Sequence, residues 1–150
     1  MENLTHKLRV LSTVAACFNR EHITWAVGAS LLLYLKGKTD TFHDIDLLVL
    51  ESDVEKVRAI IAGLGVIEPP NPDARYRTRH FIECRVQDVE LDIMAGFTIV
   101  RGGVEYDCSL KREEITDSVL INNQSIPLHS LALWKRYYQL MGRAEKAAMI

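Results

Sequence analysis

The sequence predicts a mixed α/β fold in which a β-sheet is flanked by helices. Apolar residues recur at helical spacing near both ends of the chain, at residues 4–18 and 131–141. Between them lie short β-branched or apolar runs with the length and composition of strands, at residues 23–27, 45–50 and 89–94. No repeat or linker interrupts the pattern, so we predict a single domain over residues 1–150, which is long enough to bury a core.

The first predicted strand, residues 23–27, runs into a small-residue turn formed by Gly28, Ala29 and Ser30. A short apolar helix follows and ends near Gly37. Free backbone N–H groups at such a helix start can face an anion, and the serine hydroxyl can cap the helix or contact phosphate. The alternative is an ordinary capped helix after an ordinary strand.

Two aspartates lie at the head of the next predicted strand. Residues 45–50 are almost continuously apolar, which predicts a strand covered on both faces. Because side chains alternate along a strand, Asp44 and Asp46 share one face, with backbones about 7 Å apart. Two like charges so close to an apolar core raise each other's pKa unless a cation intervenes. We therefore expect them to bind magnesium, and the alternative is a pair of surface-turn or cap residues.

A later strand is expected to supply a third carboxylate. Residues 89–94 alternate apolar and acidic side chains, so Glu90 and Asp92 share a face. Asp92 is the better candidate to join Asp44 and Asp46, because apolar residues flank it whereas Glu90 lies nearer a turn. Three carboxylates from two strands can hold two metal ions in the arrangement suited to in-line displacement at phosphorus.

The remaining segments are expected to form scaffold. Ser52 or Asp53 is predicted to cap a helix that runs to about Ala62. Prolines make residues 68–73 a loop, because they remove backbone donors and forbid helix. Residues 97–123 give an ambiguous pattern apart from a Gly-Gly turn.

Two basic residues are further candidates for contact with phosphate. Lys38 follows the short helix, and Arg77 alternates with Arg75 and Arg79, so that a strand would place all three arginines on one side. The alternatives are a favourable helix-dipole partner for Lys38 and a solvated basic sheet edge for the arginines.

Taken in order, these features resemble the nucleotidyltransferase fold of the polymerase beta-like superfamily. The resemblance is carried by Gly28-Ala29-Ser30, Asp44-Ile45-Asp46, Asp92, and an ending at residues 126–131 followed by a helix through residues 142–147. That ending is similar to small single-domain bacterial proteins of the minimal nucleotidyltransferase type. The resemblance spans about residues 7–148, and it implies a mixed sheet flanked by helices with a helix at the C-terminal end.

The resemblance also implies a role for each candidate residue. The turn at residues 28–30 would hold the β- and γ-phosphates of a nucleoside triphosphate. Asp44 and Asp46 would bind Mg²⁺ or Mn²⁺, and Asp92 would bind the metal nearer the acceptor and help deprotonate its hydroxyl. The family usually has glycine directly before the serine, whereas this chain has Ala29, whose methyl group limits close backbone approach and positive φ values.

Net charge, cysteine spacing and the length of the apolar runs argue against several kinds of partner and binding site. A net charge of −2 does not favour an extended nucleic-acid surface. The three cysteines are widely spaced, which argues against a disulfide framework or a zinc site. No apolar run has the length of a membrane span, and no signal peptide is evident, so we expect a cytoplasmic protein.

The predicted function is a metal-dependent nucleotidyltransferase that moves a nucleoside monophosphate from a triphosphate to a hydroxyl acceptor. A non-catalytic nucleotide-binding or regulatory module, such as the antitoxin half of a toxin–antitoxin pair, is the alternative that Ala29 and the lack of a substrate-holding second domain favour. Hydrolysis of phosphate esters is a third and weaker prediction, because no dedicated water-activating residue stands out beyond Asp92. The nucleotide, the acceptor and a homodimer or helical partner protein stay open.

Overall fold

The computed structural model describes residues 3–70 and 78–150. The helices are α1 (Leu4–Arg20), α2 (Ala29–Leu35), α3 (Val54–Leu64), α4 (Leu131–Leu140) and α5 (Ala144–Ala147), with short 3₁₀ turns η1 (Glu51–Asp53) and η2 (Arg112–Glu114). The strands are β1 (Trp25–Gly28), β2 (Ile45–Val49), β3 (Val66–Ile67), β4 (His80–Val86), β5 (Val89–Ala95), β6 (Thr98–Arg101), β7 (Val104–Asp107), β8 (Ile115–Ile121) and β9 (Gln124–His129).

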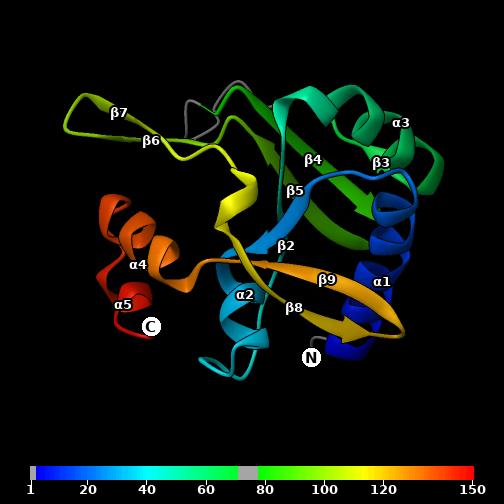
Figure 1. The fold of residues 1–150 in the computed structure, drawn as a ribbon, viewed down its shortest axis with the longest axis horizontal. Helices are drawn as coiled ribbons and strands as arrows, with labels where there is room; N and C mark the ends of the chain where they lie inside the picture. Colours follow the sequence, from blue (N-terminus) through cyan, green and yellow to red (C-terminus); the bar gives the residue numbers. More distant parts are fainter. Residues whose placement is uncertain (1–2, 71–77) are drawn as a thin grey trace.

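A mixed sheet forms the centre of the molecule (Figure 1). Its strand order is β3-β4-β5-β2-β1-β9-β8, and β6 and β7 form a separate hairpin. The β2–β5 and β1–β9 pairs are parallel, and the other neighbours are antiparallel. The predicted mixed sheet flanked by helices, with a helix at the C-terminal end, is therefore confirmed.

Helix α1 is attached to the sheet by the apolar face that the sequence predicts. Val10, Leu11 and Phe18 on this face are fully buried. The ring of Phe18 meets that of Trp25 in β1 edge-on, with centroids 5.6 Å apart. The helix begins at Asn3, whose side chain accepts a backbone N–H bond of 3.0 Å from the first turn. These contacts fix the first helix against the first strand.

The strand register positions the carboxylates. Strand β2 lies between β1 and β5, and its apolar residues, such as Leu47, are buried. The parallel register sets Asp46 beside Asp92, and the antiparallel register sets Asp46 opposite Gly28. Gly28, Asp46 and Asp92, which are far apart in the sequence, thus lie side by side on three neighbouring strands.

The helix predicted to end at about Ala62 is longer than expected. It continues to Leu64 as α3 and ends at Gly65. Asp53 lies at the N-cap position, but its carboxylate accepts a hydrogen bond from the N–H of Thr24 at 3.2 Å and makes no cap bond. The 3₁₀ turn η1 precedes the helix and takes the place of a side-chain cap.

The C-terminal helix is divided into α4 and α5 at Gly142, whose φ of +76° is left-handed. Ser130 caps α4 by accepting a backbone N–H bond of 3.2 Å. Residues 97–123, which gave an ambiguous pattern, form mainly the β6–β7 hairpin and β8. Figure 1 shows α4 and α5 near this hairpin, at the opposite end of the molecule from α1.

Across residues 3–70 and 78–150, none of the helices combines the length and the apolar character that crossing a membrane requires.

Candidate active site

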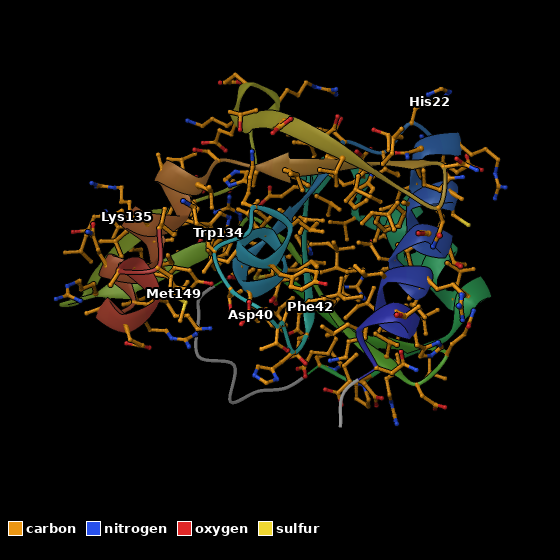
Figure 2. The ribbon with its side chains drawn as sticks, turned by 90° about the horizontal axis from the view of Figure 1, so that it is seen from below. His22, Asp40, Phe42, Trp134, Lys135 and Met149 are labelled. Carbon is orange, nitrogen blue, oxygen red and sulfur yellow. The ribbon has the colours of Figure 1, made fainter. Side chains whose placement is uncertain are left out.

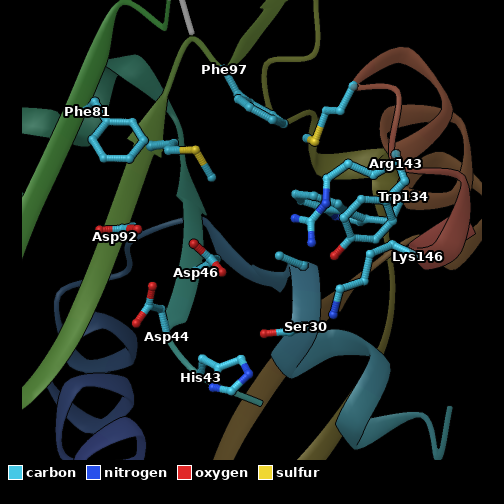
Figure 3. A pocket seen from close by; sticks show the side chains of 14 residues that line it. Ser30, His43, Asp44, Asp46, Phe81, Asp92, Phe97, Trp134, Arg143 and Lys146 are labelled. Atoms are coloured by element: carbon cyan, nitrogen blue, oxygen red, sulfur yellow. The ribbon is translucent and has the colours of Figure 1, made fainter. Parts of the chain in front are cut away.

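A cavity of about 320 Å³ lies where the β1–α2 turn, β2, β5 and the C-terminal helices meet (Figure 3). Five residues that the sequence singles out line it: Ala29, Ser30, Asp44, Asp46 and Asp92. Asp92 therefore lies on the same side of the sheet as the other two aspartates. Had it faced the opposite side, the three carboxylates could not act on one substrate.

The three carboxylates form one wall of this cavity, which we call the acidic wall. Asp46 and Asp92 are paired directly across the parallel β2–β5 ladder, and Asp44 precedes Asp46 by two residues on the same face. Asp44 is exposed, whereas Asp46 and Asp92 are half-buried. The wall is thus most solvated at Asp44 and most enclosed toward the middle of the sheet.

Burial and mutual repulsion perturb two of these acids. Burial, followed by the charges of Asp92 and Asp44, raises the pKa of Asp46 to about 8, and the charge of Arg143 opposes this rise. Burial, followed by Asp44 and nearby glutamates, raises the pKa of Asp92 to about 6. A site that concentrates like charge in this way is stabilised by a cation.

The donor set fits a hard divalent cation, because it consists of carboxylate oxygens that face one cavity. Within the described part of the chain, no three His, Cys, Asp or Glu side chains are grouped closely enough to hold a metal ion as they stand. A bound cation would therefore have to draw Asp44, Asp46 and Asp92 together by side-chain rotation.

In the turn at residues 28–30, the residue with a positive φ value is the alanine and not the glycine. Ala29 itself adopts a left-handed φ of +53°, although it carries a methyl group. Gly28 is extended, with φ −128° and ψ −171°, so it does not supply that conformation. Gly28 instead makes room: a Cβ there would lie 2.5 Å from the ring of Trp134.

Two basic residues that the sequence did not single out form the opposite, basic wall of the cavity. Arg143 and Lys146 come from α5 and the residue before it, and both line the cavity. Figure 3 shows the Arg143 guanidinium turned toward Asp46, and the amino end of Lys146 pointing toward Ser30. Their spacing of three residues on a helix was visible in the sequence, but nothing local distinguished them from surface charges.

The remaining lining is largely aromatic. Trp134 stacks on Phe97, with centroids 5.8 Å apart and planes 20° apart, and it lies 5.6 Å from Tyr138. Trp134, Tyr137 and Tyr138 are buried, so the aromatic side chains of α4 pack in the core. Trp134 and Tyr138 also line the cavity.

No protein-family model matches the sequence, and no curated protein matches it. Solved structures do match. A candidate nucleotidyltransferase from Thermotoga maritima is 24% identical, with a TM-score of 0.76 over 95% of this chain and 89% of that one. The antibiotic-resistance factor ANT(2″)-Ia, solved with adenylyl-2″-tobramycin, is 12% identical, with a TM-score of 0.64 over 96% and 87%. A lincosamide antibiotic adenylyltransferase bound to lincomycin is 16% identical, with a TM-score of 0.62 over 94% of each chain.

The chain has a nucleotidyltransferase fold. At these identities the similarity concerns the fold, so the roles of individual residues remain proposals. In this fold the acidic wall lies on the central strands, and the cavity lies between the sheet and α4 and α5.

The other predicted contacts with the nucleotide lie apart from the cavity lining or outside the described residues. Lys38 is exposed after α2 and does not line the cavity. Arg77 lies outside the described residues, 3–70 and 78–150. Glu90, the acid that the sequence placed nearer a turn than Asp92, is exposed.

Proposed function

We propose that this protein is a nucleotidyltransferase that moves a nucleoside monophosphate from a triphosphate to a hydroxyl acceptor and releases pyrophosphate. The observation that carries the proposal is the cavity in which Asp44, Asp46 and Asp92 face the β1–α2 turn. The fold-level similarity to adenylyltransferases, one solved with adenylyl-2″-tobramycin and one with lincomycin, supports a small hydroxyl compound as acceptor.

Asp44, Asp46 and Asp92 would hold Mg²⁺ or Mn²⁺, which when bound neutralises phosphate charge and favours in-line displacement. Apart from holding the metal, the protein would act by positioning the acceptor hydroxyl and the α-phosphate for the displacement. Asp92 would accept the proton of the acceptor hydroxyl. The oxygen of that hydroxyl bonds to the α-phosphorus while the bond from the α-phosphorus to the bridging oxygen breaks, and the electron pair leaves on pyrophosphate.

Several predictions about substrates and partners stay untested. The turn formed by Gly28, Ala29 and Ser30 is proposed to contact the phosphates, and Lys38 and Arg77 stay candidate contacts outside the cavity lining. A single domain, a cytoplasmic location and a homodimer or helical partner protein likewise stay predictions.

The second candidate function is a non-catalytic regulatory module, such as an antitoxin, that binds nucleotide. One specific observation favours it. Ala29 takes a left-handed conformation with a methyl group at the position where the family resemblance implies glycine. Ala29 also lines the cavity, and a methyl group on this residue limits how closely a phosphate can approach the backbone.

The decisive experiment follows the α-phosphate. Each of four nucleoside triphosphates, labelled at the α-phosphate, would be incubated with magnesium and with polyhydroxyl antibiotics, RNA or protein. We expect label to move to an acceptor, and we expect Asp46→Asn to lower the rate by about 1000-fold or more. Asp40→Asn is the matched control, because Asp40 is exposed in the preceding loop and does not line the cavity. Triphosphate binding without transfer to any acceptor would support the regulatory module instead.

A further inference from the structure

We infer that the C-terminal helices supply a subsite for the pyrophosphate part of the triphosphate, built from Arg143, Lys146 and the indole N–H of Trp134. The inference rests on the proposed function, because it names which part of the substrate, and which product, these residues bind.

The two cations of the basic wall are available to a ligand. Arg143 uses Nε in a 3.4 Å contact with Glu145, and its guanidinium lies 5.7 Å from the ring centre of Tyr138. Among the described residues, its two Nη groups and the Lys146 ammonium have no hydrogen-bond partner. Arg143 is the better phosphate ligand of the two, because its planar donors can bind two phosphate oxygens at once.

The charges of the cavity are separated rather than paired. The acidic wall and the basic wall face each other, and in the described chain no ion pair joins Arg143 to Asp46, although its charge still lowers the pKa of that carboxyl. An anion that carries its own cation matches such an arrangement. In a magnesium–polyphosphate the metal would lie at the carboxylates and the phosphate oxygens would lie at the cations.

Trp134 provides an independent sign of a missing ligand. The residue is only 1% exposed, and in the part of the chain that the structure describes its Nε1 has no acceptor. A buried N–H group without an acceptor is costly and rare in folded proteins. The edge of the ring that carries Nε1 lies against Gly28, where the turn begins, and Trp134 lines the cavity. A phosphate oxygen in the cavity could accept this hydrogen bond.

The combination favours the β- and γ-phosphates over the rest of the nucleotide. Two cations and a neutral donor match groups that concentrate negative charge, which the β- and γ-phosphates do and the ribose and base do not. When the bond to the α-phosphorus breaks, the electron pair remains on these two phosphates. Arg143 and Lys146 would therefore stabilise the leaving group as well as bind the substrate.

The two tryptophans of the chain make a direct test possible. Inorganic pyrophosphate with magnesium would be titrated into ¹⁵N-labelled protein while the two indole N–H resonances are followed. We expect the Trp134 resonance to shift. The Trp25 resonance is the internal control, because its Nε1 already donates to Asn19 at 2.9 Å and the residue does not line this cavity.

Three charge variants assign the subsite. Arg143→Gln should weaken pyrophosphate binding by about 10- to 100-fold, and Lys146→Gln by about 10-fold, as expected for charge-assisted hydrogen bonds. Lys135→Gln is the matched control in the preceding helix α4 and should change affinity less than about 2-fold. Lys135 is exposed and lies at the outer side of α4, whereas Trp134 lies on the inner side (Figure 2).

Arg143 is 47% exposed, so Arg143→Gln should fold, and thermal unfolding checks this. Arg143→Lys should restore part of the affinity. An unmoved Trp134 resonance, or equal losses in all three charge variants, would overturn the subsite. Pyrophosphate binding with the expected pattern but without nucleotidyl transfer would support the subsite and overturn the proposed function. Nucleotidyl transfer that does not depend on Arg143 and Lys146 would support the proposed function and overturn the subsite.

Discussion

The acidic wall belongs to the centre of the sheet, whereas the basic wall belongs to the C-terminal helices. Asp46 lies in β2, which is hydrogen-bonded to β1 on one side and to β5 on the other. Arg143 and Lys146 follow a left-handed glycine and belong to a helical segment of four residues and the residue before it. The hairpin supports this segment through Arg101, whose Nη1 donates to the last carbonyls of α4 at 3.2 and 3.3 Å.

The difference indicates which wall can adjust to a substrate. A strand paired on both sides moves only with its neighbours, and its residues open with the global unfolding of the domain. A short terminal helix with exposed side chains opens at lower cost, so it can close on a ligand and release a product. The acidic wall therefore sets where the chemistry occurs, and the basic wall is the part expected to move.

The largest effect is expected where the β1–α2 turn contacts α4. Gly28→Ala places a Cβ 2.5 Å from the Trp134 ring, so Trp134 and α4 must shift. We expect a loss of about 1–3 kcal/mol in the free energy of unfolding and a fall in pyrophosphate affinity. Urea denaturation measures the first effect and calorimetry the second. Gly63→Ala is the control, because its Cβ would meet open space in α3, and it should be neutral or slightly stabilising. Equal effects of the two variants would contradict the close contact between Gly28 and Trp134.

The next effect is the pH dependence of the free energy of unfolding that Asp46 in the acidic wall causes. The pKa of Asp46 is about 8 in the folded, metal-free protein and 3.8 ordinarily, so between these values the folded state holds a proton that the unfolded chain has released. The free energy of unfolding should therefore fall as pH rises from about 4 to 8 and then level off.

Asp46→Asn removes this dependence, and after allowance for solvent screening it should stabilise the metal-free protein at pH 8.5 by roughly 1–2 kcal/mol. Thermal unfolding at pH 5, 7 and 8.5 in the presence of a chelator measures both proteins. The raised pKa of Asp46 would be contradicted if the metal-free wild type became more stable as pH rises through this window and Asp46→Asn did not stabilise it.

A smaller effect is expected from the support of the basic wall. Arg101→Gln removes two hydrogen bonds to the end of α4 without touching the cavity. As a positioning residue, Arg101 should affect triphosphate binding more than the chemical step, with KM raised about 3- to 10-fold and kcat changed less. Arg101→Lys should recover part of the binding. A kcat loss with unchanged KM would be inconsistent with this positioning role.

The smallest effect concerns the turn. Ala29→Gly relieves a left-handed alanine but adds freedom to the unfolded chain, so we expect a gain of at most about 1 kcal/mol. Removal of the methyl group also lets phosphate approach the backbone, and triphosphate affinity should rise a few-fold. Parallel denaturation and nucleotide titrations test both. A lower affinity would show that the methyl group itself contacts the nucleotide.

The acidic wall could be predicted from the sequence because its residues lie in strands with strong local patterns. The alternation around Asp92 and the apolar run after Asp46 specify the faces of two strands, and one parallel pairing then brings them together. Arg143 and Lys146 could not be predicted in this way. They resemble any surface charges on a helix, and their position depends on how α4 packs against α2 and β6. Gly28 was recognised, but its role in making room for Trp134 depends on a residue more than a hundred positions away.

The cross-strand pair of Gly28 and Asp46 has one further consequence. The turn, α2 and the loop that follows form a closed excursion, because they leave the sheet at one member of this pair and return at the other. Its length and composition can therefore vary without changing the separation of the strands that carry the carboxylates. We expect that residues 31–43 of this excursion, which leave out Ser30 and Asp44, can be exchanged for the corresponding segments of other proteins of the same fold. Such an exchange would alter the choice of nucleotide while Asp44, Asp46 and Asp92 keep their place.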